Sequence, residues 1–472
     1  MEKIIKIIRA STFILICILW IGVLSEIMKT KLMDGFSDVT RKVHGFYAEE
    51  ENSLDFIFLG SSRVYSAVNP AVLWDKYGIT SYDFCCNEQS YSITYFYLKE
   101  ALKKQKPKAV VVDVSFGVAM TETREPMRHL NFAFLRPSLN KIEAVNANAE
   151  GMEKFEYLFP IRKWHSSWYN LQEENFEYSF WYDNNPYKGF SYLESVETVS
   201  LPTYDYPYNM EENVKLYYTE PLAENLEWVN KMIDYTRQQG VDLILITVPD
   251  GSAPEGQGYY NGIFRHVKDE EGVICKNYNL EMSGMHHLTA ELAEAFTEKL
   301  GEDLSKWYEI NDKRGNPKYQ QWEETVQVYE AEMEAIDIRR QTDWRSYIKN
   351  VSIGDYDLFV LQTPWTCDAD KWQVIRDNMQ LVGINLPGDS QSNYMAVVND
   401  KNMEMWVTEV NEDSNIERRR EDIYYKIDSS GITINKQIYP GINGLRLVVY
   451  DKLLQRVVDS IYINDNNLEL KR

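Results

Sequence analysis

Two residues of this 472-residue chain have the types and settings needed for acyl transfer. Ser62 stands in Gly60-Ser61-Ser62-Arg63, directly after an apolar run, and a serine at a strand end can be a nucleophile beside backbone N–H donors. His287 precedes a predicted helix, where it could act as general base to that serine. Each motif alone is more typical of a capped turn or a surface loop, so the hypothesis depends on their combination.

The surrounding pattern predicts the elements that would position these residues. Short apolar runs alternate with helical patterns, which favours an α/β fold with a parallel sheet and helices on both faces. The expected strands are 55–59, 81–86, 109–115, 242–248 and 273–278, and the expected helices are 92–105, 222–239 and 289–307. Ligands of such sheets bind at the carboxyl ends of the strands. Residues 116–221 interrupt the pattern with a Tyr- and Trp-rich stretch that we interpret as an inserted lid.

A second domain is expected after a linker at 309–322. Residues 323–472 predict an α+β domain that begins with a long charged helix over 323–350. Its expected strands are 355–362, 392–399 and 403–409, around a helix at 369–381, followed by strands and turns over 423–464. Residues 30–322 would then form the first domain.

The N-terminus predicts a membrane segment. Basic residues precede sixteen uncharged residues, 10–25, which as a helix span about 24 Å of a hydrocarbon core of about 30 Å. We interpret 1–29 as a cytoplasmic tail and uncleaved anchor, with the bulk of the chain extracytoplasmic. A cleaved signal peptide is the alternative. Residues 30–52 are polar and are expected to form a stalk.

Composition excludes some classes of function. The formal net charge is −22, so sequence-independent nucleic-acid binding is not expected. The five cysteines show neither an even disulfide framework nor metal-ligand spacing, and we expect no metal and no cofactor.

The stretch 58–65 (FLGSSRVY), followed by Val68-Asn69-Pro70, resembles the first block of SGNH (GDSL-like) hydrolases. More narrowly, it is similar to their membrane-anchored Gram-positive branch, related to DltD and alginate O-acetylation proteins. The resemblance implies a three-layer α/β/α fold with Ser62 as nucleophile and His287 as base. It further implies an oxyanion hole of backbone N–H groups from Ser62 and Cys85 (or Cys86). The family's asparagine donor is not recognisable after residues 112–115, and Asn87 or Gln89 is our candidate in its place.

The triad acid departs from the family pattern. The family's last block is Asp-x-x-His, but Gly284 stands three residues before His287. Glu281 is the nearest carboxylate and our candidate, with Asp250 as an alternative. Either a Ser62–His287 dyad works with a displaced carboxylate, or the site is degenerate.

Further resemblances concern binding. The segment 164–168 (WHSSW) looks like a motif of the same branch, so His165 and Trp168 join Arg63 and Gln89 as expected substrate-binding residues; aromatic packing of the lid is the alternative. Residues 340–464 resemble the interleukin-like EMT-inducer (ILEI-like) domain, which implies carbohydrate or protein contact or a structural role.

The family implies an esterase or O-acyltransferase that acts on acyl esters of a cell-surface polysaccharide, with a membrane-bound O-acyltransferase as partner. A catalytically silent scaffold that binds glycan or that acyltransferase is the competing hypothesis.

Overall fold

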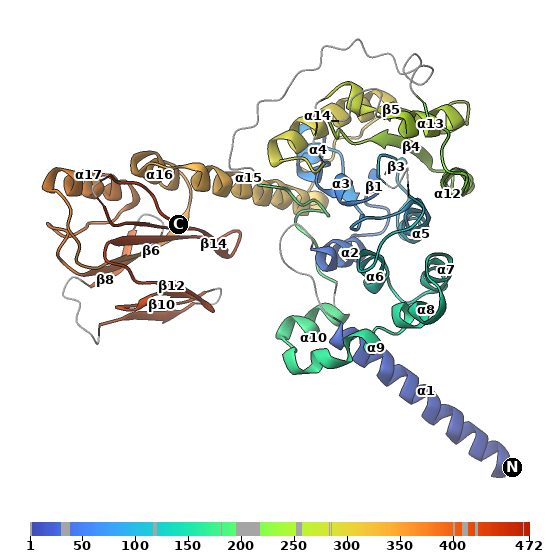
Figure 1. Cartoon of the computed structure of the whole chain (residues 1–472), viewed down its shortest axis with the longest axis horizontal. Coiled ribbons are helices and arrows are strands. Elements are labelled where there is room, and N and C mark those ends of the chain that lie inside the picture. The colour runs from blue at the N-terminus through green and yellow to red at the C-terminus, as the bar shows by residue number, and fades with distance from the viewer. Residues whose placement is uncertain are drawn as a thin grey trace. The chain divides into compact units, whose positions relative to one another are not determined.

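A five-stranded parallel sheet forms the centre of the first of two units in this computed structural model (Figure 1). Its strand order is β2–β1–β3–β4–β5. The bounds are β1 (Phe56–Leu59), β2 (Ser81–Asp83), β3 (Ala109–Asp113), β4 (Asp242–Thr247) and β5 (Val273–Asn277). Every residue of β1 and β3 is buried, so both faces of the sheet are covered, as continuous apolar runs predict.

The structure describes residues 2–29, 38–116, 120–180, 182–194, 218–251, 257–282, 284, 286–399, 402–407, 414–420, 423–465 and 467–472. The first unit runs to Val326 and the second comprises Gln327–Arg472. The boundary, which we predicted at residue 323, falls inside helix α15 (Gln320–Arg340).

Helices cover the parallel sheet in pairs. The helix α5 (Tyr91–Ala101) packs against α12 (Ala223–Gln239), and α4 (Pro70–Tyr77) packs against α14 (Ala290–Trp307). The mixed α/β fold with a parallel sheet is thus confirmed. The helix α13 (Gly258–Val267) was not predicted.

Residues 38–52 do not form the polar stalk that we expected. The helix α2 (Val39–Ala48) buries Val43 and Phe46 completely, and the ring of Phe46 stacks on Phe84 with centroids 4.0 Å apart. The prediction was wrong because polar residues alternate with the apolar ones and conceal a helical apolar face. Residues 30–37 of the expected stalk lie outside the described residues.

The described part of the predicted insert contains a run of short helices between residues 127 and 180. Its elements are α6 (Met127–Ala133), α7 (Leu139–Asn148), α8 (Gly151–Leu158), α9 (Ile161–Trp164), η2 (His165–Asn170) and α10 (Glu173–Phe180). Of these, α9, η2 and α10 contact the end of the N-terminal helix α1 (Glu2–Met28). Residues 195–217 of the insert lie outside the described residues.

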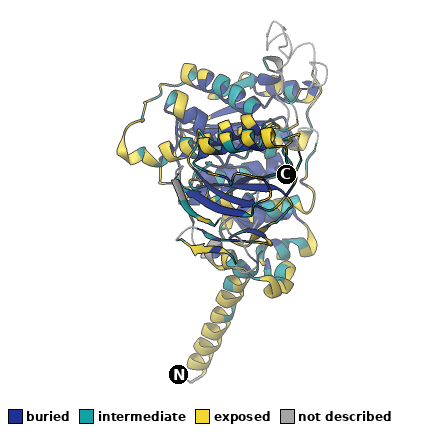
Figure 2. Cartoon of the chain, turned by 90° about the vertical axis from the view of Figure 1, so that its left-hand side faces the viewer, coloured by how far each residue is buried: buried dark blue, intermediate teal, exposed yellow. Residues whose placement is uncertain are grey.

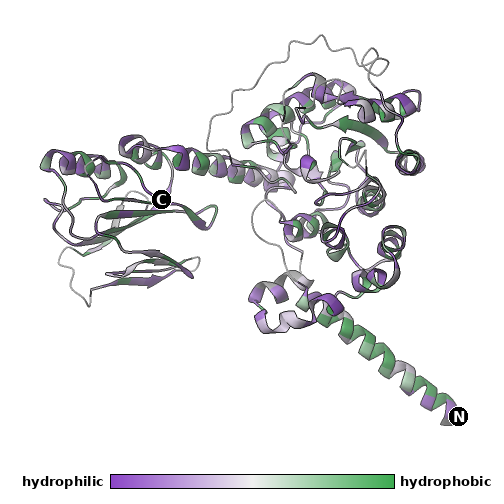
Figure 3. Cartoon of the chain, viewed as in Figure 1, coloured by the Kyte–Doolittle hydropathy of each residue, from purple (hydrophilic) through white to green (hydrophobic). Residues whose placement is uncertain are grey.

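The helix α1 is long and apolar enough to cross a membrane. Its side chains are exposed over most of its length (Figure 2), and Figure 3 shows it in the green of hydrophobic residues along most of its ribbon.

Two antiparallel sheets form the core of the second unit. One has the order β14–β13–β6–β7–β8 and the other β12–β11–β10–β9. The strands are β6 (Tyr356–Gln362), β7 (Tyr394–Asn399), β8 (Asn402–Val407), β9 (Ile416–Arg419), β10 (Tyr424–Asp428), β11 (Gly431–Ile434), β12 (Gln437–Pro440), β13 (Leu445–Asp451) and β14 (Arg456–Ile463). The expected helix at 323–350 is two helices, α15 and α16 (Trp344–Val351), because Asp343 caps a new helix start.

Alternate residues of β6 belong to different cores. Leu358 and Val360 pack with α16 and α17 (Ala369–Met379), whereas Phe359 and Leu361 pack with residues of the other sheet. The expected α+β organisation is thus present.

Candidate active site

Ser62 stands at the carboxyl end of a central strand. After β1, Gly60 adopts a φ of +151°, and a Cβ on it would lie 2.6 Å from Val64 Cγ2. Glycine is therefore required where the chain turns from β1 into the short helix α3 (Ser62–Tyr65). The Ser61 hydroxyl caps that helix by accepting from the Arg63 N–H at 3.3 Å. This turn holds the Ser62 side chain at the sheet edge, partly exposed.

His287 reaches Ser62 from the loop before α14. Its Nε2 lies 2.8 Å from Ser62 Oγ, across 225 residues of sequence. Burial lowers the pKa of His287 to about 4, and the positive charges of His286 and Arg63 act in the same direction. The imidazole is therefore neutral at neutral pH, and Nε2 can accept the serine proton when the ring proton is on Nδ1.

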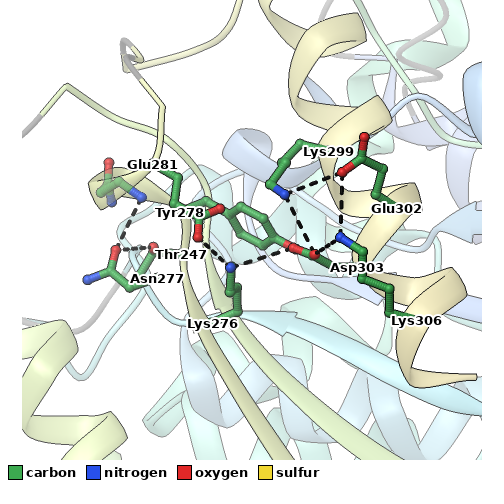
Figure 4. Close-up of polar contacts among 10 residues, drawn as sticks. Thr247, Lys276, Asn277, Tyr278, Glu281, Lys299, Glu302, Asp303 and Lys306 are labelled. Atoms are coloured by element: carbon green, nitrogen blue, oxygen red, sulfur yellow. Dashed lines mark hydrogen bonds and ion pairs between the residues drawn. The ribbon is translucent and has the colours of Figure 1, made fainter. Parts of the chain in front are cut away.

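Glu281, our candidate acid, is paired with a lysine. Its Oε1 accepts a hydrogen bond from Lys276 on β5, and its Oε2 has no hydrogen-bond partner among the described residues. Figure 4 shows Lys276 between Glu281 and Asp303, whose Oδ2 lies 3.6 Å from the Lys276 Nζ and accepts from Tyr278. Because this lysine holds its carboxylate, we do not assign Glu281 the role of acid to His287.

The expected acid position itself is closed by backbone. A Cβ on Gly284 would lie 2.2 Å from both the carbonyl carbon and oxygen of Pro249, and 2.7 Å from the Asp250 nitrogen. A Cβ on Gly251, whose φ is +75°, would in turn lie 2.6 Å from the Gly284 oxygen. The loops that follow β4 and β5 thus touch through their two glycines, and the chain has no room for a side chain at position 284.

Asp250, the alternative acid, pairs with Arg63, the residue that follows Ser62. Its Oδ2 lies 2.7 Å from Arg63 Nη2 and accepts from the Tyr260 hydroxyl at 2.8 Å. Arg63 is only 6% exposed, so the expected substrate-binding residue is a buried cation. Burial tends to lower the pKa of Arg63, but the charges of Asp113 and Asp250 outweigh it and raise that pKa. Arg63 therefore stays charged close to His287.

Asp113, at the end of β3, is the second carboxylate beside Arg63 and was missed in the sequence. Its Oδ1 accepts from the N–H groups of Ser115 at 3.0 Å and Val248 at 3.1 Å. Burial raises its pKa above the ordinary aspartate value. Its position after an apolar strand, next to the strand of Ser62, was the available signal.

Tyr65 links Ser62 to the predicted oxyanion side. The pKa of the Tyr65 hydroxyl is raised mainly by burial, and its hydrogen bond with the Ser62 side chain opposes that rise. The same hydroxyl donates to Asn87 Oδ1 at 3.0 Å. Lys42 lies 3.8 Å above the Tyr65 ring. Sequence reasoning missed Tyr65, although it follows Ser62 by three residues at a helix start, a spacing that puts side chains on one face.

Cys85 is completely buried and donates its thiol to the Phe58 carbonyl at 3.3 Å. Burial holds the pKa of this thiol well above its ordinary value, so it stays a neutral thiol rather than a thiolate. We expected the backbone N–H of Cys85 to be an oxyanion-hole donor. The thiol contact does not test that expectation.

The remaining predicted binding residues lie in other surroundings. Gln89 is buried and donates to Thr94 Oγ1 at 3.2 Å, so it packs against α5. His165 and Trp168 belong to η2, which contacts α1; Nδ1 of His165 bonds to the Arg162 carbonyl at 2.8 Å, and Trp168 is exposed. Of the expected site residues, the structure thus brings together Ser62, Arg63, His287 and Asn87.

Among the described residues, no group of three or more His, Cys, Asp or Glu side chains could hold a metal ion. No protein-family model matches this sequence, and no curated protein matches it. Any assignment of its chemistry consequently depends on the geometry around Ser62.

Proposed function

We propose that this protein is a serine esterase or O-acyltransferase of the SGNH type that acts on acyl esters of a cell-surface polysaccharide. The 2.8 Å contact between His287 Nε2 and Ser62 Oγ carries this proposal. It joins a hydroxyl at a strand end to a base that is neutral at the pH where it must work.

The reaction would proceed in two displacements. His287 Nε2 takes the proton from Ser62 Oγ, which attacks the ester carbonyl and forms a tetrahedral oxyanion. Collapse breaks the ester bond, and the departing sugar hydroxyl receives the proton from His287. A water or a second sugar hydroxyl then attacks the acyl-serine with the same base and regenerates Ser62. Water gives hydrolysis, and a sugar gives transfer.

The oxyanion would be held on the side of Tyr65. Backbone N–H groups of Ser62 and Cys85 are the proposed donors, with the Asn87 amide as a side-chain donor. The Tyr65 hydroxyl donates to Asn87 Oδ1 and so fixes the orientation of the Asn87 amide group. Tyr65 therefore acts as a positioning residue for Asn87.

We place the site outside the cytoplasm, with α1 as a single-pass anchor in the cell membrane. This location would put Ser62 near a membrane-bound O-acyltransferase that delivers acyl groups. The second unit is proposed as an ILEI-like module that contacts glycan or protein.

A silent scaffold is the second candidate function. The backbone that closes position 284 and the low pKa of His287 favour it, because a weak base and an absent family acid both slow acyl transfer. Such a protein would keep the fold and bind glycan or the acyltransferase without turnover.

The deciding experiment treats the full chain in detergent micelles with a fluorophosphonate probe and with an acetyl ester. Labelling and turnover should occur in the parent protein and be lost in Ser62→Ala and His287→Ala. Ser66→Ala is a matched control, since that buried serine follows the same short helix and its hydroxyl donates to the Arg63 carbonyl. A parent protein without labelling or turnover would favour the scaffold.

A further inference from the structure

The end of helix α1 is built into the folded unit. The Ile161 N–H donates to Ser25 Oγ at 3.3 Å, and Ser179 Oγ donates to the Glu26 carbonyl at 2.9 Å. Lys29 is 2% exposed and donates to the Ala133 carbonyl at 2.7 Å. The insert therefore contacts the end of α1 through hydrogen bonds, at the point where the exposed apolar surface of α1 ends.

That exposed surface sets the depth of the insert. Side chains of α1 are exposed almost continuously from Lys3 to Leu24, whereas Ser25 is buried. The apolar part would occupy hydrocarbon, so Ser25 marks the helix exit. Elements that hydrogen-bond to residues 25–29 must lie at the headgroup level (Figure 1 shows α9 and α10 beside the end of α1).

Exposed hydrophobic side chains gather on those elements and their neighbours. We call them the insert platform, and they are Met152, Phe155, Phe159, Trp168, Tyr169 and Phe176. Trp168 is 55% and Tyr169 73% exposed, and their rings stack on each other with centroids 3.8 Å apart. Phe155 and Phe159 form a second stack at 4.7 Å. Each pair presents a rigid apolar surface to solvent, which soluble proteins avoid unless something covers it.

Charge does not favour this location by itself. Two carboxylates of α8 are paired with cations: Glu156 lies 3.1 Å from Arg162, and Glu153 lies 2.9 Å from Arg128. The segment 150–180 nevertheless has more acidic than basic residues, so its exposed aromatic side chains, and not its charge, are what would hold it at the membrane. Trp and Tyr are the side chains that favour the membrane–water interface.

We propose that the insert platform lies in the headgroup region of the membrane that α1 spans. The platform would hold the first unit on the bilayer at two places, through the anchor and through the aromatic side chains. This inference depends on the proposed membrane location of α1 and is independent of any chemistry at Ser62.

The test uses the full chain in nanodiscs of phosphatidylcholine and phosphatidylglycerol. A photoreactive benzoyl-phenylalanine replaces Tyr169 in one variant and Phe155 in another, and mass spectrometry measures lipid adducts after illumination. Leu15, which is 56% exposed on α1, is replaced in the anchor control. Tyr259 is the matched negative control, because it is an exposed tyrosine on α13, which lies at the opposite end of this unit from α1 (Figure 1).

We expect adducts at positions 15, 169 and 155 at several times the yield at position 259. Adducts at position 15 alone would overturn the platform while leaving the anchor in place. No adduct at position 15 would overturn both, because α1 would then not lie in lipid. Adducts of position 169 with protein in place of lipid would also overturn the platform.

Discussion

The substitution Gly284→Asp would introduce an aspartate where SGNH hydrolases have their triad acid. We expect that it does not improve the proposed catalysis. A new Cβ at that position meets Pro249 carbonyl atoms at 2.2 Å, where ordinary contacts begin at 3.4 Å. The loops after β4 and β5 must therefore separate by more than an ångström or the backbone must twist. Forcing atoms into a packed site costs about 1–3 kcal/mol, so the unfolding temperature should fall by several degrees. The displaced loops also carry Asp250 and His287, so the 2.8 Å contact to Ser62 should lengthen and turnover should drop.

The assay pairs thermal unfolding with acetyl-ester turnover for three proteins: the parent, Gly284→Asp and Gly284→Ala. Alanine separates the steric effect from the charge, since it adds the same Cβ without a carboxylate. Gly388→Ala is the matched control, because a Cβ added there would meet nothing within 4 Å and the stability should barely change. Higher turnover of Gly284→Asp at unchanged stability would refute the reasoning, since it would mean that the loops can open to admit a working acid.

The remaining predictions concern the base, the oxyanion side and the buried supports. Because the pKa of His287 is lowered to about 4 and only the neutral imidazole is a base, kcat/KM should rise through about pH 4 and be flat above about pH 5; an inflection near 6.5 would contradict the burial argument. Tyr65→Phe should lower kcat about tenfold with little change in KM, whereas Tyr91→Phe, which also removes a buried hydroxyl, should affect only thermal stability; equal kinetics for both would exclude a positioning role. Glu49→Gln should lower the free energy of unfolding by about 3–5 kcal/mol in calorimetry, since the fully buried Lys188 loses the charge 2.7 Å away, and a loss under about 1 kcal/mol would mean that the pair is solvated.

The sheet was predictable because its strands carry their own signal. Continuous apolar runs such as Ala109–Asp113 are typical of strands that are buried on both faces, and each predicted run coincides with a strand. The helix α2 was missed because a single short helix shows only one apolar face, and Lys42 and His44, both buried, stand among its apolar residues.

The candidate site was predictable only in part. Ser62 follows the turn after β1, and His287 lies in the loop before α14. Both positions could be predicted because the sequence shows where the strand ends and where the helix begins. The pairing partner of each carboxylate could not be predicted, because it depends on contacts between segments that are distant in the sequence. Glu281 forms an ion pair with Lys276, and Asp250 forms one with Arg63. The spacing of these residues along the chain does not predict either pair.

The hydrogen bonds between the insert and residues 25–29 determine how a soluble version of this protein should be designed. A truncation that begins at residue 30 removes more than a tether, because Ser25 and Lys29 are interior parts of the fold. Their loss leaves the Ile161 N–H without Ser25 and the Ala133 carbonyl without Lys29, and it exposes apolar surface beside them. A chain cut there is expected to be poorly soluble and to lose the helices of its insert first. A truncated chain that begins before Ser25, with the apolar residues upstream of Ser25 replaced by polar ones, would preserve the contacts between residues 25–29 and the insert.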